Sequence, residues 1–224
     1  AYALIMAATG AISLVVNRVV YSALSRIHRT GKLIDPAYRE ASQLFSWAAV
    51  AFLAPLALAS SLVTRVLYGP TFDATAPILA ILALAGILQV AAGPSGSAAM
   101  ALGNTKQLAT TGFLTSGTYL ACFGVAAAYG TTLSFAWATY FASFVSLLIV
   151  GRFLGRIGIP RESRNRGLMV AVLGSGLGLA STFGSGRLVF PYWAELGVAT
   201  LSLALGTAFL VRTVQRFNQV VEDS

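Results

Sequence analysis

Seven long apolar runs, separated by shorter polar gaps, divide this chain. The runs cover residues 3–24, 44–67, 77–102, 108–129, 133–153, 167–183 and 188–211. A helix needs about 20 apolar residues to cross the hydrocarbon core of a bilayer, and the runs are close to that length, the sixth being the shortest. The pattern therefore predicts an all-α integral membrane protein with about seven transmembrane helices.

The cations are distributed unevenly among the gaps. Of the 15 Lys and Arg residues, four lie in the first gap, one in the third, five at the fifth and two in the tail. Arg65, at the end of the second run, counts with the second gap, the sixth gap holds one cation, the fourth holds none, and Arg18 lies inside the first run. Lys and Arg collect in cytoplasmic loops, so the alternation predicts a first end outside the membrane and a cytoplasmic C-terminal tail.

The composition supports a membrane location. Hydrophobic residues make up 57% of the chain and charged residues 10%, whereas a soluble domain carries about 25% charge. The net charge of +8 does not indicate nucleic acid, because no basic stripe is interleaved with aromatic residues. The cations are better explained as loop anchors that favour an anionic inner leaflet. We therefore expect a multi-pass protein of the plasma membrane with membrane lipids, and no nucleic acid, as partners.

The organisation along the chain suggests a piece of a longer protein. The sequence begins at Ala1, without Met, at the edge of an apolar run. An odd number of spans that begins outside requires an upstream span or signal sequence, so we expect further spans before Ala1. The basic fifth gap, with Gly158 and Pro160, is the best candidate for a flexible joint. It separates a five-helix part (1–155) from two further transmembrane helices and a tail (156–224).

Residue patterns typical of catalysis are missing. The only histidine, His28, lies among cations in a loop and has no partners for a metal site, which usually needs three or four ligands. The single cysteine, Cys122, lies inside an apolar run, where a small core residue is expected. No two of the seven acids have a spacing suited to acid–base catalysis, and no glycine-rich phosphate loop is visible. We expect no enzyme activity, no catalytic residues, no metal and no cofactor.

Four polar side chains inside the runs are the candidate substrate-binding residues: Arg18, Gln89, Tyr119 and Tyr140. Arg18 lies six residues before the inner end of the first run, about 9 Å along a helix. It either faces a central cavity and holds an anionic headgroup, such as a diphosphate, or snorkels to the inner phosphates. The amide and the two phenols either hydrogen-bond sugars or bond neighbouring helices, which is the more frequent outcome.

Small residues recur within two of the runs. Gly93 and Ser97 are four residues apart in the third run, and Gly174 and Gly178 repeat this spacing in the sixth. Such faces let helix backbones approach closely. A broken helix that opens part of a transport path is the competing interpretation of the third run, and close packing is favoured.

Three segments together resemble one family. Residues 66–84 read VLYGPTFDATAPILAILAL, residues 101–106 read ALGNTK and residues 21–27 read YSALSRI. In order and spacing they resemble the bacterial polysaccharide flippases, in which a Leu-Phe-Gly-type turn leads through Ala-Pro into a Leu-rich helix. Ser22 stands where the family usually has proline. The resemblance covers residues 1–155, and the last two runs match only in character.

The resemblance implies the multidrug/oligosaccharidyl-lipid/polysaccharide flippase superfamily, with two helical bundles around a central cavity. This chain would be most of the second bundle and would flip polyprenyl-diphosphate-linked oligosaccharide across the bacterial inner membrane for polysaccharide or lipopolysaccharide biosynthesis. Expected partners are that lipid-linked oligosaccharide, the N-terminal bundle, and a polysaccharide polymerase or glycosyltransferases. The alternatives are a drug or cation antiporter of the same superfamily, an envelope-assembly enzyme subunit, and a non-transporting scaffold.

Overall fold

A computed structural model describes residues 9–10, 20–30, 34–184, 200, 204, 207–208, 211–217 and 219. This part of the chain is helical and contains no strand. Residues 20–29 form a helical segment. The elements that follow are α2 (Asp35–Leu58), α3 (Ser60–Tyr68), the 3-10 helix η1 (Pro70–Thr75), α4 (Ala76–Ala101), α5 (Thr105–Tyr129), α6 (Thr132–Arg156) and α7 (Arg161–Gly184).

Four segments of the described chain are long and apolar enough to cross a membrane. They are Asp35–Leu58, Pro70–Ala101, Thr105–Tyr129 and Thr132–Arg156. They correspond to the second to fifth apolar runs, and α7 covers the sixth run. Most of the first and seventh runs lies outside the described residues. The all-helical class is confirmed and a membrane-spanning bundle is indicated, while the number of seven spans stays a prediction.

The boundaries predicted for the second run are wrong. Its helix, α2, begins at Asp35 and ends at Leu58, and a separate helix α3 follows a break at Ala59. Pro36 starts the helix because a proline at the first helical position gives up only a donor that would be unpaired anyway. Pro55, within the last turn of α2, lacks the N–H that would continue the ladder. Apolar counting detects neither effect.

Two glycines make tight turns between consecutive helices. Gly130 follows α5 with φ at +63°, and Gly103 lies between α4 and α5 with φ at +70°. This left-handed region is strained for residues with a Cβ. Directly after Gly130, the Thr131 side chain accepts a hydrogen bond from the Ser134 N–H at 3.2 Å and caps α6. The α5–α6 hairpin is therefore specified locally.

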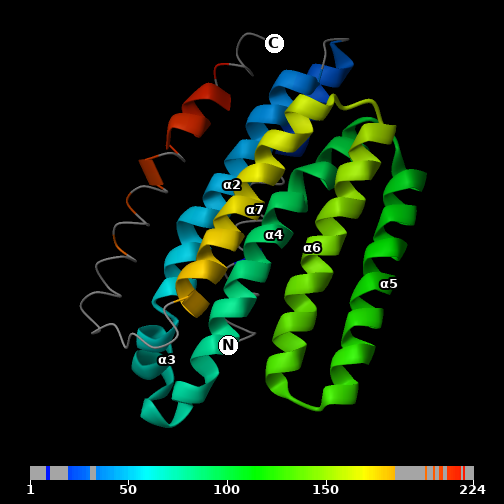
Figure 1. Ribbon diagram of the computed structural model, residues 1–224. Coiled ribbons are helices and arrows are strands. Elements are labelled where there is room, and N and C mark those ends of the chain that lie inside the picture. The colour runs from blue at the N-terminus through cyan, green and yellow to red at the C-terminus, as the bar shows by residue number, and fades with distance from the viewer. Residues whose placement is uncertain are drawn as a thin grey trace.

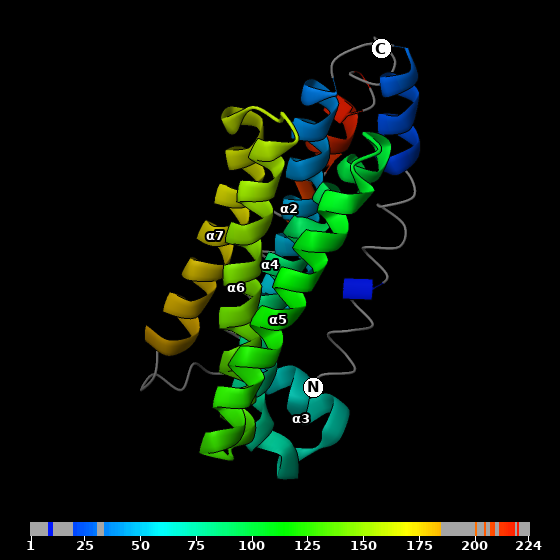
Figure 2. The same cartoon turned by 90° about the vertical axis from the view of Figure 1, so that its right-hand side faces the viewer.

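The helices pack in a chain of neighbours. Helices α2, α4 and α7 pack against one another, α6 packs on α4, and α5 packs mainly on α6 (Figure 1). Helix α5 is the outermost of these, as the turned view shows (Figure 2). Only Thr111 and Ala126 are buried on it, whereas α4 is buried nearly all round. The core thus surrounds α4.

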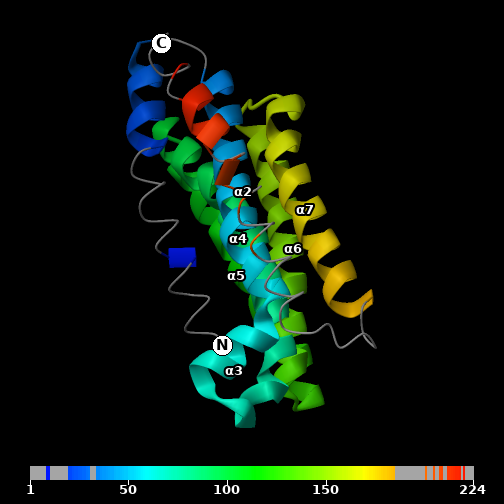
Figure 3. The ribbon, with the colours of Figure 1, turned by 90° about the vertical axis from the view of Figure 1, so that its left-hand side faces the viewer.

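The cation-rich segments meet at one end of the bundle. The 20–29 segment, the start of α2, the α4–α5 and α6–α7 turns and residues 211–217 all lie at this end, which we call the basic end (Figure 3). The opposite end holds α3, η1 and the α5–α6 turn. There Arg65 Nη2 lies 2.6 Å from Asp73 Oδ2. The alternation of cations along the chain is therefore an axial separation of charge in the fold.

Helices α2 and α7 approach closely because glycines and serines face each other. Ser46 Oγ donates a hydrogen bond shared between the Ser42 carbonyl at 2.9 Å and the Gly167 carbonyl at 2.8 Å. A Cβ on Gly167 would collide with the side chain of Ser42 and lie 3.0 Å from its carbonyl carbon. A Cβ on Gly174 would lie 2.8 Å from Val50 Cγ2. The predicted role of small residues in close packing is confirmed for this pair of helices.

Close packing at a glycine is also found in the third run. Helix α4 continues without interruption through Gly93 and Pro94, so the broken-helix interpretation is wrong. A Cβ on Gly93 would lie 2.7 Å from Cε1 of Phe45, whose side chain is fully buried. Glycine at this position therefore lets the ring of Phe45 seat against the backbone of α4.

Gly167→Ala should destabilise the bundle. The added methyl meets the buried Ser42 side chain and backbone, and overpacking of this kind costs about 1–3 kcal/mol. The matched control is Gly176→Ala in the same helix, where a Cβ meets nothing within 4 Å. Thermal unfolding of the purified protein in detergent should show a lower midpoint for Gly167→Ala and an unchanged or higher one for Gly176→Ala. Equal midpoints would contradict the close approach of α2 and α7.

Candidate functional site

A cluster of polar side chains joins α4, α5 and α6 in the interior of the bundle. Gln89 Nε2 lies 3.2 Å from Tyr119 Oη and 3.1 Å from Ser143 Oγ. Tyr119 Oη lies 2.9 Å from Ser143 Oγ. We call Gln89, Tyr119 and Ser143 the polar cluster. Each pair of its members is within hydrogen-bonding distance, so one residue from each of three helices meets at a single point.

The hydrogen bonds of the polar cluster have a definite direction. Ser143 Oγ donates its single proton to the Thr139 carbonyl one turn earlier, at 2.7 Å. Ser143 is therefore an acceptor toward both other members, and Tyr119 must donate to it. Gln89 donates both amide protons, one to Tyr119 and one to Ser143. The cluster is thus held by a chain of donors that ends on the α6 backbone.

The polar cluster lies midway along its helices. Gln89 is 13 residues from the start of α4, Tyr119 is 14 from the start of α5 and Ser143 is 11 from the start of α6. At 1.5 Å per residue, each lies about 15–20 Å from both helix ends. In a membrane-spanning bundle this is the centre of the hydrocarbon layer, where unsatisfied polar groups are costly and polar residues most often bond one another or a substrate.

The structure describes three of the four predicted site residues and brings two of them together. Gln89 and Tyr119 are in direct contact within the polar cluster. Tyr140 is buried on α6, and its ring packs edge-on against Trp137 at 6.1 Å and Phe141 at 6.0 Å between ring centres. Arg18 lies outside the described residues. That Tyr140 shares a site with the other two stays a prediction.

Sequence reasoning missed Ser143. Serine is common in transmembrane helices and usually bonds its own backbone, so its residue type carries little signal. Thr139, Ser143 and Ser146 recur at helical spacing, which indicates that this face of the fifth run is polar.

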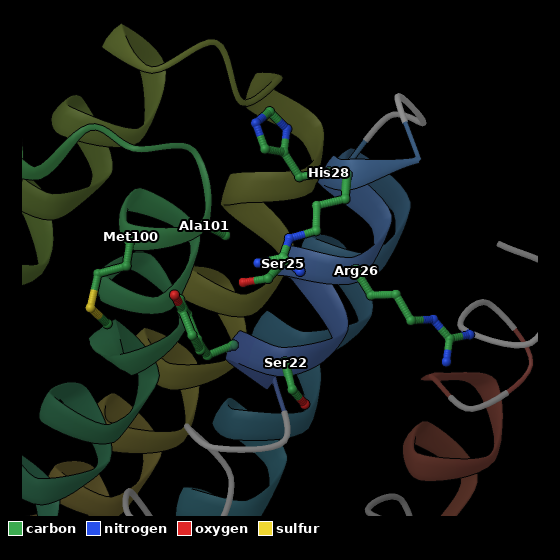
Figure 4. A pocket seen from close by; sticks show the side chains of 8 residues that line it. Ser22, Ser25, Arg26, His28, Met100 and Ala101 are labelled. Carbon is green, nitrogen blue, oxygen red and sulfur yellow. The ribbon is translucent and has the colours of Figure 1, made fainter.

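A second feature is a cavity at the basic end, between the 20–29 segment and the end of α4 (Figure 4). Its volume is about 340 Å³, and its lining includes Tyr21, Ser22, Ser25, Arg29, Met100 and Ala101. Ser25 Oγ is buried there without a hydrogen-bond partner among the described residues. Arg26 also borders the cavity, and its side chain extends to the side away from α4 in Figure 4.

The chemistry of this cavity favours an anion. Hydroxyl groups and guanidinium groups line it, and no carboxylate does. Guanidinium and hydroxyl donors suit phosphate oxygens, which accept several hydrogen bonds at once. The cavity also includes part of residues 21–27, one of the three segments on which the family resemblance rests. Among the described residues, no group of three His, Cys, Asp or Glu side chains is placed to hold a metal ion.

Comparisons with known proteins identify no relative of this chain. No protein-family model matches the chain, and no curated protein or solved structure matches it either. The candidate site therefore rests on the geometry of the polar cluster and of the basic-end cavity.

Ser143→Ala should weaken the attachment of α5. The change removes the acceptor shared by Gln89 and Tyr119, and hydrogen bonds between membrane helices average about 0.6 kcal/mol each, up to about 1.7. We expect a loss of about 1–2 kcal/mol of unfolding free energy in detergent. Ser146→Ala is the matched control on the same helix, because the buried Ser146 hydroxyl has no hydrogen-bond partner among the described residues.

Removal of an unpaired buried hydroxyl is neutral or stabilising, so Ser146→Ala should unfold at the same temperature as the parent protein or higher. Ser143→Ala with parental stability would contradict the role of the polar cluster in joining the three helices.

Proposed function

We propose that this chain is part of a transporter that flips polyprenyl-diphosphate-linked oligosaccharide across a bacterial inner membrane, for polysaccharide or lipopolysaccharide biosynthesis. The resemblance of residues 66–84, 101–106 and 21–27 to polysaccharide flippases is one support. The chain would then be most of the second bundle, working with an N-terminal bundle around a central cavity. The basic end would face the cytoplasm.

Physical requirements make the proposal specific. A lipid-linked oligosaccharide carries an anionic diphosphate and many sugar hydroxyls, and both must leave water to cross the membrane. Transporters meet this need with polar groups near the bilayer midplane and with access that alternates between the two sides. A membrane bundle without buried polar groups would offer no such path.

The observation that carries the proposal is the polar cluster. It places amide and hydroxyl groups of Gln89, Tyr119 and Ser143 halfway along three helices of an otherwise apolar bundle. Gln89 and Tyr119 are only partly buried, so part of each side chain remains accessible. An amide and a phenol are the groups with which proteins commonly bond sugar hydroxyls. The basic-end cavity supplies the cationic groups that suit a diphosphate.

The charged groups favour a saccharide carrier over a cation antiporter. A proton or cation relay needs a carboxylate near the midplane. The described carboxylates are Asp35, Glu40, Asp73 and Glu162, and each lies at or near an end of a helix. The described part of the bundle therefore offers neutral hydrogen-bonding groups where an antiporter would need an acid.

Gln89→Leu in the complete protein should lower flipping about tenfold, which corresponds to the loss of one or two hydrogen bonds in the transport path. The measurement is translocation of lipid-linked oligosaccharide in proteoliposomes, normalised to protein abundance. Ser146→Ala, which touches neither Gln89 nor Tyr119 in the described contacts, is the control and should flip normally. If Gln89→Leu lowered only thermal stability and left flipping intact, the polar cluster would be a packing feature and the proposal would lose its main support.

Arg18→Ala tests the predicted contact with the anionic headgroup independently. If Arg18 faces the cavity, the variant should flip less substrate at unchanged abundance, because the diphosphate loses a charged partner. Snorkelling to the inner phosphates predicts the opposite result, normal flipping. The same proteoliposome assay distinguishes the two.

A further inference from the structure

The seam between α5 and α6 contains a groove at the basic end. Its volume is about 430 Å³. Gln107, Thr110 and Leu114 line it from α5, and Ile149, Arg152 and Arg156 line it from α6. We call it the seam groove. It is separate from the polar cluster and from the basic-end cavity, and none of the predicted site residues lines it.

The seam groove changes from polar to apolar along its length. On α6, Arg156 is the last residue of the helix and Ile149 lies seven residues deeper. On α5, Gln107 lies in the first turn and Leu114 seven residues deeper. Seven residues are about 10 Å of helix. Both walls therefore present polar side chains at the basic end and aliphatic side chains about 10 Å further into the bundle.

The hydrogen-bond donors in the polar part of the groove suit an anion. The Thr110 hydroxyl donates to the Lys106 carbonyl at 3.0 Å, so its proton is already used. The remaining donors are the two guanidinium groups and the Gln107 amide. Arg152 and Arg156 are four residues apart on one face of α6, and neither forms an ion pair with any described residue. No carboxylate lines the groove.

The surroundings of the groove indicate a lipid. Leu114 is 56% exposed, and Phe113 and Leu120 on the same helix are 81% and 74% exposed. On α6, Leu148 is 51% exposed. Exposed aliphatic and aromatic side chains on a membrane-spanning helix suit contact with acyl chains. A soluble anion would bond the arginines but would gain nothing from Leu114 and Ile149.

We propose that the seam groove binds one acidic phospholipid, with its phosphate between Arg152 and Arg156 and an acyl chain along Leu114 and Ile149. Guanidinium groups pair with phosphate through two parallel hydrogen bonds, which explains two arginines on one face. The lipid would lie in the leaflet at the basic end and would cover the seam where the outermost helix α5 meets α6. This site does not depend on the proposed transport function.

The test counts bound lipid by native mass spectrometry of the complete protein, titrated in detergent with phosphatidylglycerol, phosphatidylcholine or glycerol phosphate. The parent protein should bind phosphatidylglycerol more tightly than phosphatidylcholine and should not retain glycerol phosphate. Each arginine near acidic lipid contributes about a fivefold gain in affinity, so Arg152→Gln/Arg156→Gln should bind phosphatidylglycerol about 25-fold more weakly. Each single variant should lose about fivefold in affinity for phosphatidylglycerol. The single variants replace the double variant in the test if the double variant does not fold.

Arg166→Gln is the matched control. It removes the same charge from an exposed position on α7, outside the groove, and should bind within about twofold of the parent protein. Equal losses for Arg166→Gln and the groove variants would mean diffuse attraction to the basic end and would overturn the proposal. Equal binding of both phospholipids, or retention of glycerol phosphate alone, would overturn it as well.

Discussion

Close contact between helix backbones is the constraint on which this bundle depends. Inside a bilayer, water no longer drives apolar side chains together, so helices associate through packing and through hydrogen bonds between them. At the α2–α7 contact, Gly167 has no side chain and Ser46 bonds its carbonyl across the interface at 2.8 Å. At the α2–α4 contact, Gly93 admits the ring of Phe45. These contacts hold α2, α4 and α7 together and give α6 a fixed surface on α4.

The α5–α6 hairpin is attached by different means. Helix α5 buries only Thr111 and Ala126, and its apolar side chains mostly face outward. The polar cluster compensates by bonding Tyr119 to both α4 and α6 at mid-depth. The same bundle thus combines helices packed around α4 with an outer helix that packs mainly on α6 and is bonded to α4 and α6 by the polar cluster.

The sequence predicted some features of this fold well because their causes are local. Apolar run length is a direct consequence of bilayer thickness, and four runs correspond to candidate spans. The uneven cations predicted which gaps share an end of the bundle, as the arrangement of the helices confirms. The second span differs from its apolar run because its helix begins at Asp35, beside Pro36, and breaks at Ala59, after Pro55, so its limits do not follow hydropathy alone. Gln89 and Tyr119 were found because amides and phenols are unusual in apolar runs, whereas Ser143 was missed because serine is not.

The charge separation between the two ends has an electrical consequence. Arg65 and Asp73 neutralise each other at one end, while arginines collect at the other. The bundle is therefore a permanent dipole along the direction in which it would cross the membrane. In an energised membrane each cation gains about 2.3 kcal/mol per 100 mV on the negative side relative to the positive side. Several such charges make inverted insertion progressively less favourable as the voltage rises, so the membrane potential itself would maintain the orientation of the protein.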